Sequence, residues 1–401
     1  MLVLLRKKIG KFVPASLRSF LLRHFSVLDE RTSWWESKDP YKDEPPYSTY
    51  ESPYPFTVGI FKEIWHRHIY LVAACKELKI SYKLIDINAP DWIEQVKESK
   101  CVAFFYHPSV QLSIWKEIYD ERLKYMADIT SAPIFPKYEE MFMYESKRRM
   151  AYWLETHGVP HAKTYVFYNK VDALKYVETA NMPIVAKTNM GARAAGVEIF
   201  HSRNGAMKYV KQVFSNGIVH ADGDRRDADW GCAIFQDYIE TPYEWRVIKI
   251  GNAYFAHQKL KKGDYCSGSG RVGWVKPPEQ LLDFVRDVAA KSSIETADID
   301  VFEDNGQYFV NEIQAFWGWI AHYQMLVNGI PGYYRYLEDV GKWEFVEGIF
   351  CRNGGCNFRI ITALKSLGFD IEYDFSSLGE KVDQDDYDSS VQSFRESEAQ
   401  H

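Results

Sequence analysis

The sequence has few cysteines, no excess of positive charge and no long apolar run at its start. Its six cysteines are irregularly spaced, and Cys351 and Cys356 are too isolated to predict a zinc site. Because no apolar secretory segment is visible, we expect reduced thiols and a cytoplasmic protein. The formal net charge of −6 at pH 7 gives no whole-protein argument for nucleic-acid binding, so we expect no nucleic-acid partner.

The chain is long enough to bury a substantial core. Its 401 residues, 46% of them hydrophobic, predict two to three subdomains. Residues 1–25 combine basic and apolar side chains with no acidic residue. This composition is typical of a helix on an anionic bilayer, here the inner face of the membrane, but packing against the protein's own domain explains it equally well.

The most informative segment is an acidic hairpin. Two short predicted strands, 300–302 and 307–313, flank a turn that contains Gly306. The turn brings Asp300 beside Glu312, although the two residues are twelve positions apart.

Three side chains of this hairpin form a candidate metal site. Asp300 and Glu312 supply carboxylates, and Gln314 faces the same side as Glu312 because the two are two residues apart on a strand. Mg²⁺ prefers one or two carboxylates, completed by phosphate oxygens and water. The segment therefore predicts Mg²⁺ held over ATP phosphates. Considered alone, the segment is more often a solvated hairpin edge that carries unconnected acids, and the other segments below are what favour the metal site.

Two lysines are candidates for binding those phosphates. Lys147 lies in the first turn of a helix predicted to begin after Ser146, where exposed amides favour an anion, although a lysine in a first turn is more often merely solvated. Lys187 ends an apolar strand, where an ammonium without a partner is costly. The loop of small residues that follows is neither a Walker A motif nor a dinucleotide fingerprint. We take three residues of this loop as nucleotide-binding candidates, Gly191, Arg193 and Gly196.

Residues 233–251 are predicted to form two strands interrupted by a short polar linker. Such a linker can offer backbone groups to an adenine edge. Glu244 can then bind the ribose hydroxyls, and Arg246, on the same strand face, can reach the transferred phosphate. Considered alone, the segment is typical of an ordinary β-hairpin that carries surface charges, and only its place in series with the other segments favours the nucleotide site.

In this order the four segments resemble the ATP-grasp superfamily of carboxylate–amine ligases, such as D-alanine:D-alanine ligases and ribosomal-protein glutamate ligases, over roughly residues 57–330. The resemblance implies that Lys147 and Lys187 bind phosphate and that the three hairpin side chains bind Mg²⁺. It implies that the nucleotide base and ribose are bound by Gln236, Tyr238, Ile239 and Glu244. The basic residues expected at the transferred phosphoryl group are Arg246, Lys259 and Arg271.

The sequence also departs from the pattern of the superfamily. Gln314 stands where the metal triad usually ends in Asn, and Gln236 replaces a common acid. Residues 315–319, Ala-Phe-Trp-Gly-Trp, replace a common Ser/Thr-Pro-Gly. These departures imply a remote subfamily with a different substrate pocket.

Strands and helices alternate before the nucleotide segments and predict a small parallel α/β domain. The expected elements are strands 56–61, 82–87 and 101–106 and helices 69–78 and 92–98. Ligands bind beyond the carboxyl ends of strands in such sheets. Three residues just past strand ends are therefore substrate candidates, His66, Arg67 and His107. An ordinary role as exposed loop residues is the alternative.

The predicted fold class is α+β, an ATP-grasp fold of two lobes that sandwich ATP, preceded by the small parallel domain. The predicted divisions are a basic segment 1–28, a linker 29–55, the pre-ATP-grasp domain 56–135, the ATP-grasp domain 136–375 and a disordered tail 376–401.

The resemblance implies an ADP-forming ligase that uses ATP and Mg²⁺ to join a small-molecule carboxylate to an amine through an acyl phosphate. One expectation is the addition of an amino acid to a cell-surface glycan precursor. Two alternatives are a kinase that phosphorylates a hydroxyl or sugar with the same residues, and a catalytically silent ATP-binding scaffold.

Overall fold

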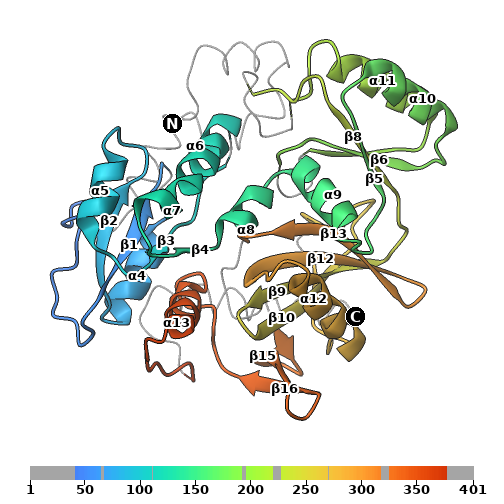
Figure 1. Cartoon of the computed structure of the whole chain (residues 1–401). Coiled ribbons are helices and arrows are strands. Elements are labelled where there is room, and N and C mark those ends of the chain that lie inside the picture. The colour runs from blue at the N-terminus through green and yellow to red at the C-terminus, as the bar shows by residue number, and fades with distance from the viewer. Residues whose placement is uncertain are drawn as a thin grey trace, which may run out of the picture.

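The computed structural model describes residues 41–64, 67–110, 112–191, 196–219, 227–269, 271–317 and 325–376. Three sheets organise this part of the chain: a parallel sheet at the N-terminal side, a small antiparallel sheet and a large antiparallel sheet (Figure 1). The predicted α+β class is therefore confirmed. The basic segment expected over residues 1–28 and the tail expected after residue 376 lie outside the described residues. Within the described ranges, no helix has the length and apolar character needed to cross a membrane.

The N-terminal sheet is parallel, with strand order β2-β1-β3-β4. Its strands are β1 (Thr57–Lys62), β2 (Ser81–Asp86), β3 (Phe104–Phe105) and β4 (Ile134–Phe135). The associated helices are α4 (Ile69–Glu77), α5 (Trp92–Ser99), α6 (Ser113–Lys124), α7 (Met126–Ile129) and α8 (Tyr138–Met143). The five elements predicted in this region are all present, and only the third strand is markedly shorter than expected.

Two hydrophobic clusters cover the two faces of this sheet. One contains residues of α4 together with α13 (Cys356–Ser366), a helix from the far end of the chain. The other contains residues of α5 and α6 together with Phe316. Residues in the range predicted as a linker also lie against the sheet, since Ser48 donates its backbone N–H to the Tyr82 carbonyl at 3.0 Å.

The small sheet is antiparallel, with strand order β5-β8-β6-β7. Its strands are β5 (Thr164–Phe167), β6 (Ile184–Lys187), β7 (Val197–Phe200) and β8 (Ala233–Asp237). Residues of α10 (Lys170–Thr179) and α11 (Arg203–Val213) pack with it in one core. The preceding helix, α9 (Lys147–Thr156), begins after Ser146 as predicted.

The large sheet follows the path β13-β12-β9-β10-β15-β14, with β11 paired to β10 and β16 to β15. Its strands are β9 (Tyr243–Ile250), β10 (Ala253–Leu260), β11 (Val272–Gly273), β12 (Thr296–Asp304), β13 (Gln307–Gln314), β14 (Leu326–Val327), β15 (Ile330–Leu337) and β16 (Lys342–Glu347). Because β8 and β9 belong to different sheets, the linker between them joins two sheets. The β-hairpin alternative for residues 233–251 is therefore wrong.

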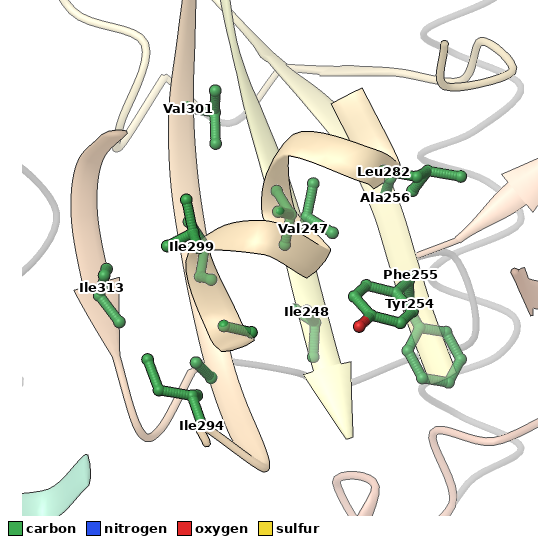
Figure 2. Packing of buried hydrophobic residues seen from close by; sticks show 14 of the residues in the cluster. Val247, Ile248, Tyr254, Phe255, Ala256, Leu282, Ile294, Ile299, Val301 and Ile313 are labelled. Carbon is green, nitrogen blue, oxygen red and sulfur yellow. The ribbon is translucent and has the colours of Figure 1, made fainter. Parts of the chain in front are cut away.

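Helix α12 (Glu279–Ala290) packs against one face of the large sheet. Figure 2 shows Leu282 beside Ala256, within the core that the helix and sheet share. Side chains alternate along a strand, so the residues next to Ile299 and Val301 point to the opposite face. That opposite face carries the charged residues of the candidate site.

Candidate active site

The predicted acidic hairpin is present, and its register is the predicted one. Strands β12 and β13 are joined by Asn305 and Gly306, which both have positive φ (50° and 75°), as a two-residue hairpin turn requires. Asp300 lies opposite Glu312, and on its other side it lies opposite Arg246 of β9. One cationic and two acidic side chains therefore meet across three neighbouring strands.

Asp300 is paired with two cations on this face. Arg246 donates from Nε to Oδ1 at 3.0 Å and from Nη2 to Oδ2 at 3.1 Å, and Lys259 Nζ contacts Oδ2 at 2.5 Å. Burial opposes ionisation of Asp300, but Arg246 and Lys259 outweigh it and hold the pKa below its usual value. The neighbouring Asp298 and Asp300 carboxylates raise the pKa of Arg246 against the effect of burial. Asp300 is therefore a fixed anion within a paired cluster.

Asp298 adds a second carboxylate beside Asp300 on the same face. Its Oδ2 lies 3.0 Å from Arg246 Nη2, whereas its buried Oδ1 has no hydrogen-bond partner among the described residues. Burial, followed by the neighbouring charge of Asp300, raises the pKa of Asp298 well above its usual value, despite Arg246. This oxygen is a buried acceptor that a cation or a hydroxyl donor would satisfy.

Asn311 connects Lys187 to Glu244. Lys187 Nζ donates to Asn311 Oδ1 at 2.8 Å, and Asn311 Nδ2 donates to Glu244 Oε1 at 2.5 Å. The other oxygen of Glu244 lies 2.8 Å from Lys259. In a regular strand Asn311 would point away from the face that carries Glu312, but the ladder has a bulge after Asp300. The bulge explains how two adjacent residues both serve this face.

Burial dominates the titration of both groups that Asn311 connects. It lowers the pKa of Lys187 to about 8, although Glu312 partly opposes the shift. It raises the pKa of Glu244, although Lys259 opposes that shift. Only 8% of the Lys187 residue surface is exposed. The ammonium ends a fully buried strand, as the sequence predicted, and its hydrogen-bond partner is a neutral amide.

Lys147 lies at the start of α9 and contacts Glu312 at 2.8 Å and Glu145 at 3.4 Å. It also donates to the Gly191 carbonyl at 2.9 Å. Burial opposes its charge, but the two carboxylates outweigh burial and raise the pKa of Lys147. Lys147 is therefore held between the helix start, the loop after β6 and the acidic hairpin, and is not solvated.

The predicted metal ligands supply a donor set of suitable chemistry. Asp300 and Glu312 offer carboxylate oxygens. The Gln314 carbonyl accepts the Glu145 N–H at 2.9 Å, while its amide nitrogen donates to Glu312. The carbonyl retains a second lone pair. Among the described residues, no group of three or more His, Cys, Asp or Glu side chains could hold a metal ion by itself. Two carboxylates and an amide oxygen instead suit a Mg²⁺ ion whose remaining ligands are phosphate oxygens and water.

The glycine loop after β6 is tightly packed at both of its described ends. Gly191 has φ of 141°, and a side chain at Gly196 would meet Thr188 Oγ1 at 1.8 Å. Both glycines are thus required by the backbone geometry. Arg193 lies outside the described residues.

The predicted adenine linker begins at the end of β8. Gln236 is buried and donates to Thr164 Oγ1 at 3.1 Å on β5, so its side chain is engaged within the small sheet. Tyr238 donates to Glu240 at 2.7 Å and accepts from Lys261 at 3.0 Å, and Ile239 follows it in the linker.

Arg271 lies apart from the other basic candidates. The residue is exposed, and its guanidinium donates to the Lys261 carbonyl at 3.4 Å. The described contacts do not bring Arg271 to the acidic face, whereas Arg246 and Lys259 both reach Asp300.

Two of the three substrate candidates meet at the edge of the N-terminal sheet. Arg67 follows β1, His107 follows β3, and Arg67 Nη1 lies 3.2 Å from His107 Nε2. The third candidate, His66, lies outside the described residues.

Four residues of these two regions were not anticipated from the sequence: Glu145, Asp298, Asn311 and Arg359. Asp298 could have been found, because it lies two residues before Asp300 and so shares its face. Asn311 depends on a bulge, and the other two depend on tertiary packing, which no local pattern reports.

Comparison with solved structures identifies the fold. The chain is similar to N5-carboxyaminoimidazole ribonucleotide synthetase from Thermus thermophilus, with a TM-score of 0.51, 12% identity and 79% of each chain covered. It is less similar to D-alanine–D-alanine ligase from Bacillus anthracis, with a TM-score of 0.44, 13% identity and coverage of 65% of this chain and 87% of that one. The predicted ATP-grasp fold is confirmed.

Comparison of sequences gives a more limited match. Phosphoribosylamine–glycine ligase from Fusobacterium nucleatum is 24% identical over 153 residues, which are 36% of this chain. The match spans about a third of that relative's length, 34%. No family model matches the chain.

Proposed function

We propose that the protein is an ATP-dependent ligase that joins a carboxylate to an amine and releases ADP and phosphate. One observation carries the proposal. Lys147 and Lys187 come from different elements, yet both reach the acidic hairpin, where Lys147 contacts Glu312 and Lys187 contacts Asn311. Two buried ammonium groups beside a row of oxygen ligands form a binding site suited to a triphosphate with its cation.

The chain's own residues have distinct roles in the proposed reaction. Lys147 and Lys187 neutralise phosphate oxygens, and Asp300 and Glu312, with the Gln314 carbonyl, hold Mg²⁺. When bound, Mg²⁺ offsets negative charge on the phosphates. Arg246 and Lys259 hold Asp300 in place by direct contacts and add positive charge near the transferred phosphoryl group. Glu244 remains the proposed partner of the ribose hydroxyls.

The proposed chemistry has two steps. A substrate carboxylate oxygen attacks the γ-phosphorus of ATP, the bond to the β-phosphate oxygen breaks, and ADP leaves with an acyl phosphate formed on the substrate. An amine then attacks the acyl carbon, phosphate leaves, and the amine loses a proton as the amide forms. Positioned charge accounts for most of the rate enhancement in this kind of transfer.

The first test is product identification. Purified protein is incubated with ATP, Mg²⁺ and a pool of amino acids, amines, sugar acids and nucleotide sugars, and products are analysed by mass spectrometry. A product whose mass equals two reactants less one water, formed with ADP, supports the ligase. The pool includes the amino-acid and glycan-precursor pair expected from the sequence.

Two outcomes contradict the proposed reaction. A reactant that carries an added phosphoryl group identifies a kinase. Bound ATP that is never consumed identifies a silent scaffold. Glu312→Gln is the matched control, because any ATP-dependent product should disappear with that carboxylate.

A further inference from the structure

We propose that Arg67, His107 and Arg359 form a binding site for an anionic group, a carboxylate or a phosphate, on one of the two substrates. This inference rests on the ligase function proposed above, and it adds that one of the two substrates carries a negatively charged group. The three residues come from the loop after β1, the loop after β3 and helix α13.

Arg359 has no ionic partner in the described part of the chain. Its guanidinium lies over the rings of Phe316 and Trp317, at 5.0 and 5.2 Å from their centroids. No acceptor is described for the five N–H donors of this guanidinium. Burial lowers the pKa of Arg359, although Cys356 and more distant phenol and carboxyl groups partly oppose the shift, so the cost of desolvating this cation is only partly compensated.

The guanidinium of Arg67 also lacks a carboxylate among its described contacts. Its backbone N–H donates to the nearby Glu63, whose other oxygen accepts the Ser109 hydroxyl. The side chain of Arg67 instead donates to His107 Nε2 at 3.2 Å. Glu63 thus contacts the backbone of Arg67, and its described contacts do not include the guanidinium.

His107 connects the two guanidiniums. Burial, then the charge of Arg67, then that of Arg359 lower the pKa of His107 well below its usual value. The geometry agrees, because Arg67 contacts the ring directly and Arg359 lies over Phe316, against which the ring packs. The ring is neutral. With Nε2 accepting from Arg67, the inferred tautomer carries its hydrogen on Nδ1, which adds one more donor.

The cluster adjoins the acidic hairpin. Phe316 closely follows β13, and its ring centroid lies 4.9 Å from that of His107 and 5.1 Å from that of Tyr144. Tyr144 precedes Glu145, which contacts Lys147. Few residues of the chain thus separate the rings beside this cluster from the residues at the proposed site of phosphoryl transfer.

Known chemistry favours an oxyanion as the missing partner. Two guanidiniums beside one imidazole repel one another, and a carboxylate or phosphate between them offsets that cost with several charge-assisted hydrogen bonds. The position beyond the carboxyl ends of two neighbouring parallel strands is where open α/β sheets bind ligands. Lysine would not substitute well, because it lacks the planar fork.

Isothermal titration with two probes tests the site. The full chain, saturated with Mg²⁺ and a non-hydrolysable ATP analogue to occupy the phosphate lysines, is titrated with inorganic phosphate and, separately, with malonate. We expect the wild type to bind at least one probe, and Arg359→Gln and Arg67→Gln each to weaken that binding at least about tenfold, the loss expected for one charge-assisted hydrogen bond. Tighter binding of phosphate points to a phosphorylated substrate, and tighter binding of malonate to an additional carboxylate.

Arg335→Gln is the matched control, since Arg335 is exposed and pairs with Glu344 on the neighbouring strand. It removes the same charge and should leave probe binding within about twofold of wild type. Far-UV circular dichroism checks that each variant is folded. The proposal is overturned if the wild type binds neither probe or if Arg359→Gln and Arg67→Gln bind as well as the wild type.

A separate titration distinguishes this site from the ligase function. If the ATP analogue does not bind, the ligase proposal fails. Binding of phosphate and malonate to the anion site is then measured in a Lys187→Met variant without nucleotide. Probe binding that still depends on Arg359 in that variant supports the anion site alone.

Discussion

Two clusters of basic side chains in the described part of this protein are paired in opposite ways. On the large sheet, Arg246 and Lys259 each contact two carboxylates. At the edge of the N-terminal sheet, the guanidiniums of Arg67 and Arg359 contact aromatic rings and an imidazole. The first arrangement compensates its own charge, whereas the second leaves positive charge available.

The difference separates groups that build a site from groups that receive a ligand. A cation bonded to two buried carboxylates is fixed before any substrate arrives, and its removal leaves those carboxylates without compensation. A cation without an acid contributes little to folding and can bind an incoming anion without first breaking an ion pair. Lys187 is intermediate, because its hydrogen-bond partner is the neutral Asn311 amide.

The largest effect on stability is expected for Arg246→Gln, which tests whether the cations of the large sheet are compensated by their carboxylates. Asp298 and Asp300 would lose their shared partner in a buried site, so we expect a loss of about 3–5 kcal/mol in the free energy of unfolding. Urea denaturation measures it. Arg335→Gln, which breaks an exposed pair, should cost no more than about 1 kcal/mol. A similar small cost for Arg246→Gln would show that the cluster is not compensated as described.

The next largest effect is expected for Glu312→Gln, measured in catalysis. Removing one charged group at the phosphates should raise the barrier by about 3–4 kcal/mol, which lowers turnover roughly 10²- to 10³-fold. Lys147 keeps Glu145 as a partner, so the fold should persist. The rate of ADP release, with circular dichroism as the check on folding, decides the matter, and near wild-type turnover would remove the metal assignment.

The pH dependence of nucleotide binding tests whether Lys187 binds the phosphates. Its pKa of about 8 in the free protein means that the ammonium is charged below that pH and loses its proton above it. If nucleotide phosphates stabilise the charged form, binding takes up a proton at higher pH, and the dissociation constant rises by up to about tenfold per pH unit. Titrations from about pH 7 to about pH 9.5, which bracket this pKa, measure the change.

Lys187→Arg is the matched control for the pH experiment. Arginine stays charged throughout this range, so the variant should show a flat profile. A wild-type profile as flat as that of the variant would mean that Lys187 does not bind the phosphates. The same titration makes a statement about stability: because the unfolded lysine keeps its proton to higher pH, the cost of burying the charge is present below the folded-state pKa of about 8 and declines as pH rises.

The smallest effect is expected for the stability of Arg359→Gln. No described carboxylate loses a partner, and one desolvated charge is removed, so the free energy of unfolding should change by less than about 1 kcal/mol in either direction. Urea denaturation beside Arg246→Gln gives the comparison directly. A loss as large as that of Arg246→Gln would assign Arg359 a structural role.

Local sequence patterns were sufficient to predict the acidic hairpin and the first elements of the N-terminal sheet. The Asn305-Gly306 turn and the alternation along its strands predicted the pairing of Asp300 with Glu312, because turn chemistry sets the register. The first strands and helices were predictable from their apolar spacing and lengths. Lys187 was singled out because a lysine in an apolar strand needs a partner.

The contacts that give the candidate site its character were not predictable in the same way. Asn311 reaches the site through a bulge that shifts the ladder by one residue. No residue type in the segment predicts this bulge. Arg359 lies on a helix that returns from the C-terminal part of the chain to pack beside α4, so its neighbours depend on long-range packing. The charge pairing of Arg246 with Asp298 likewise requires the order of strands in the sheet.

The passage from β13 to Phe316 is short. Phe316 lies only four positions after Glu312, so even a fully extended chain keeps their Cα atoms within about 14 Å of one another. The backbone therefore fixes a short spacing between the acidic hairpin and the ring that borders the proposed anion site. In the proposed ligase, this spacing would set how far apart a substrate's anionic group and its reacting carboxylate can lie.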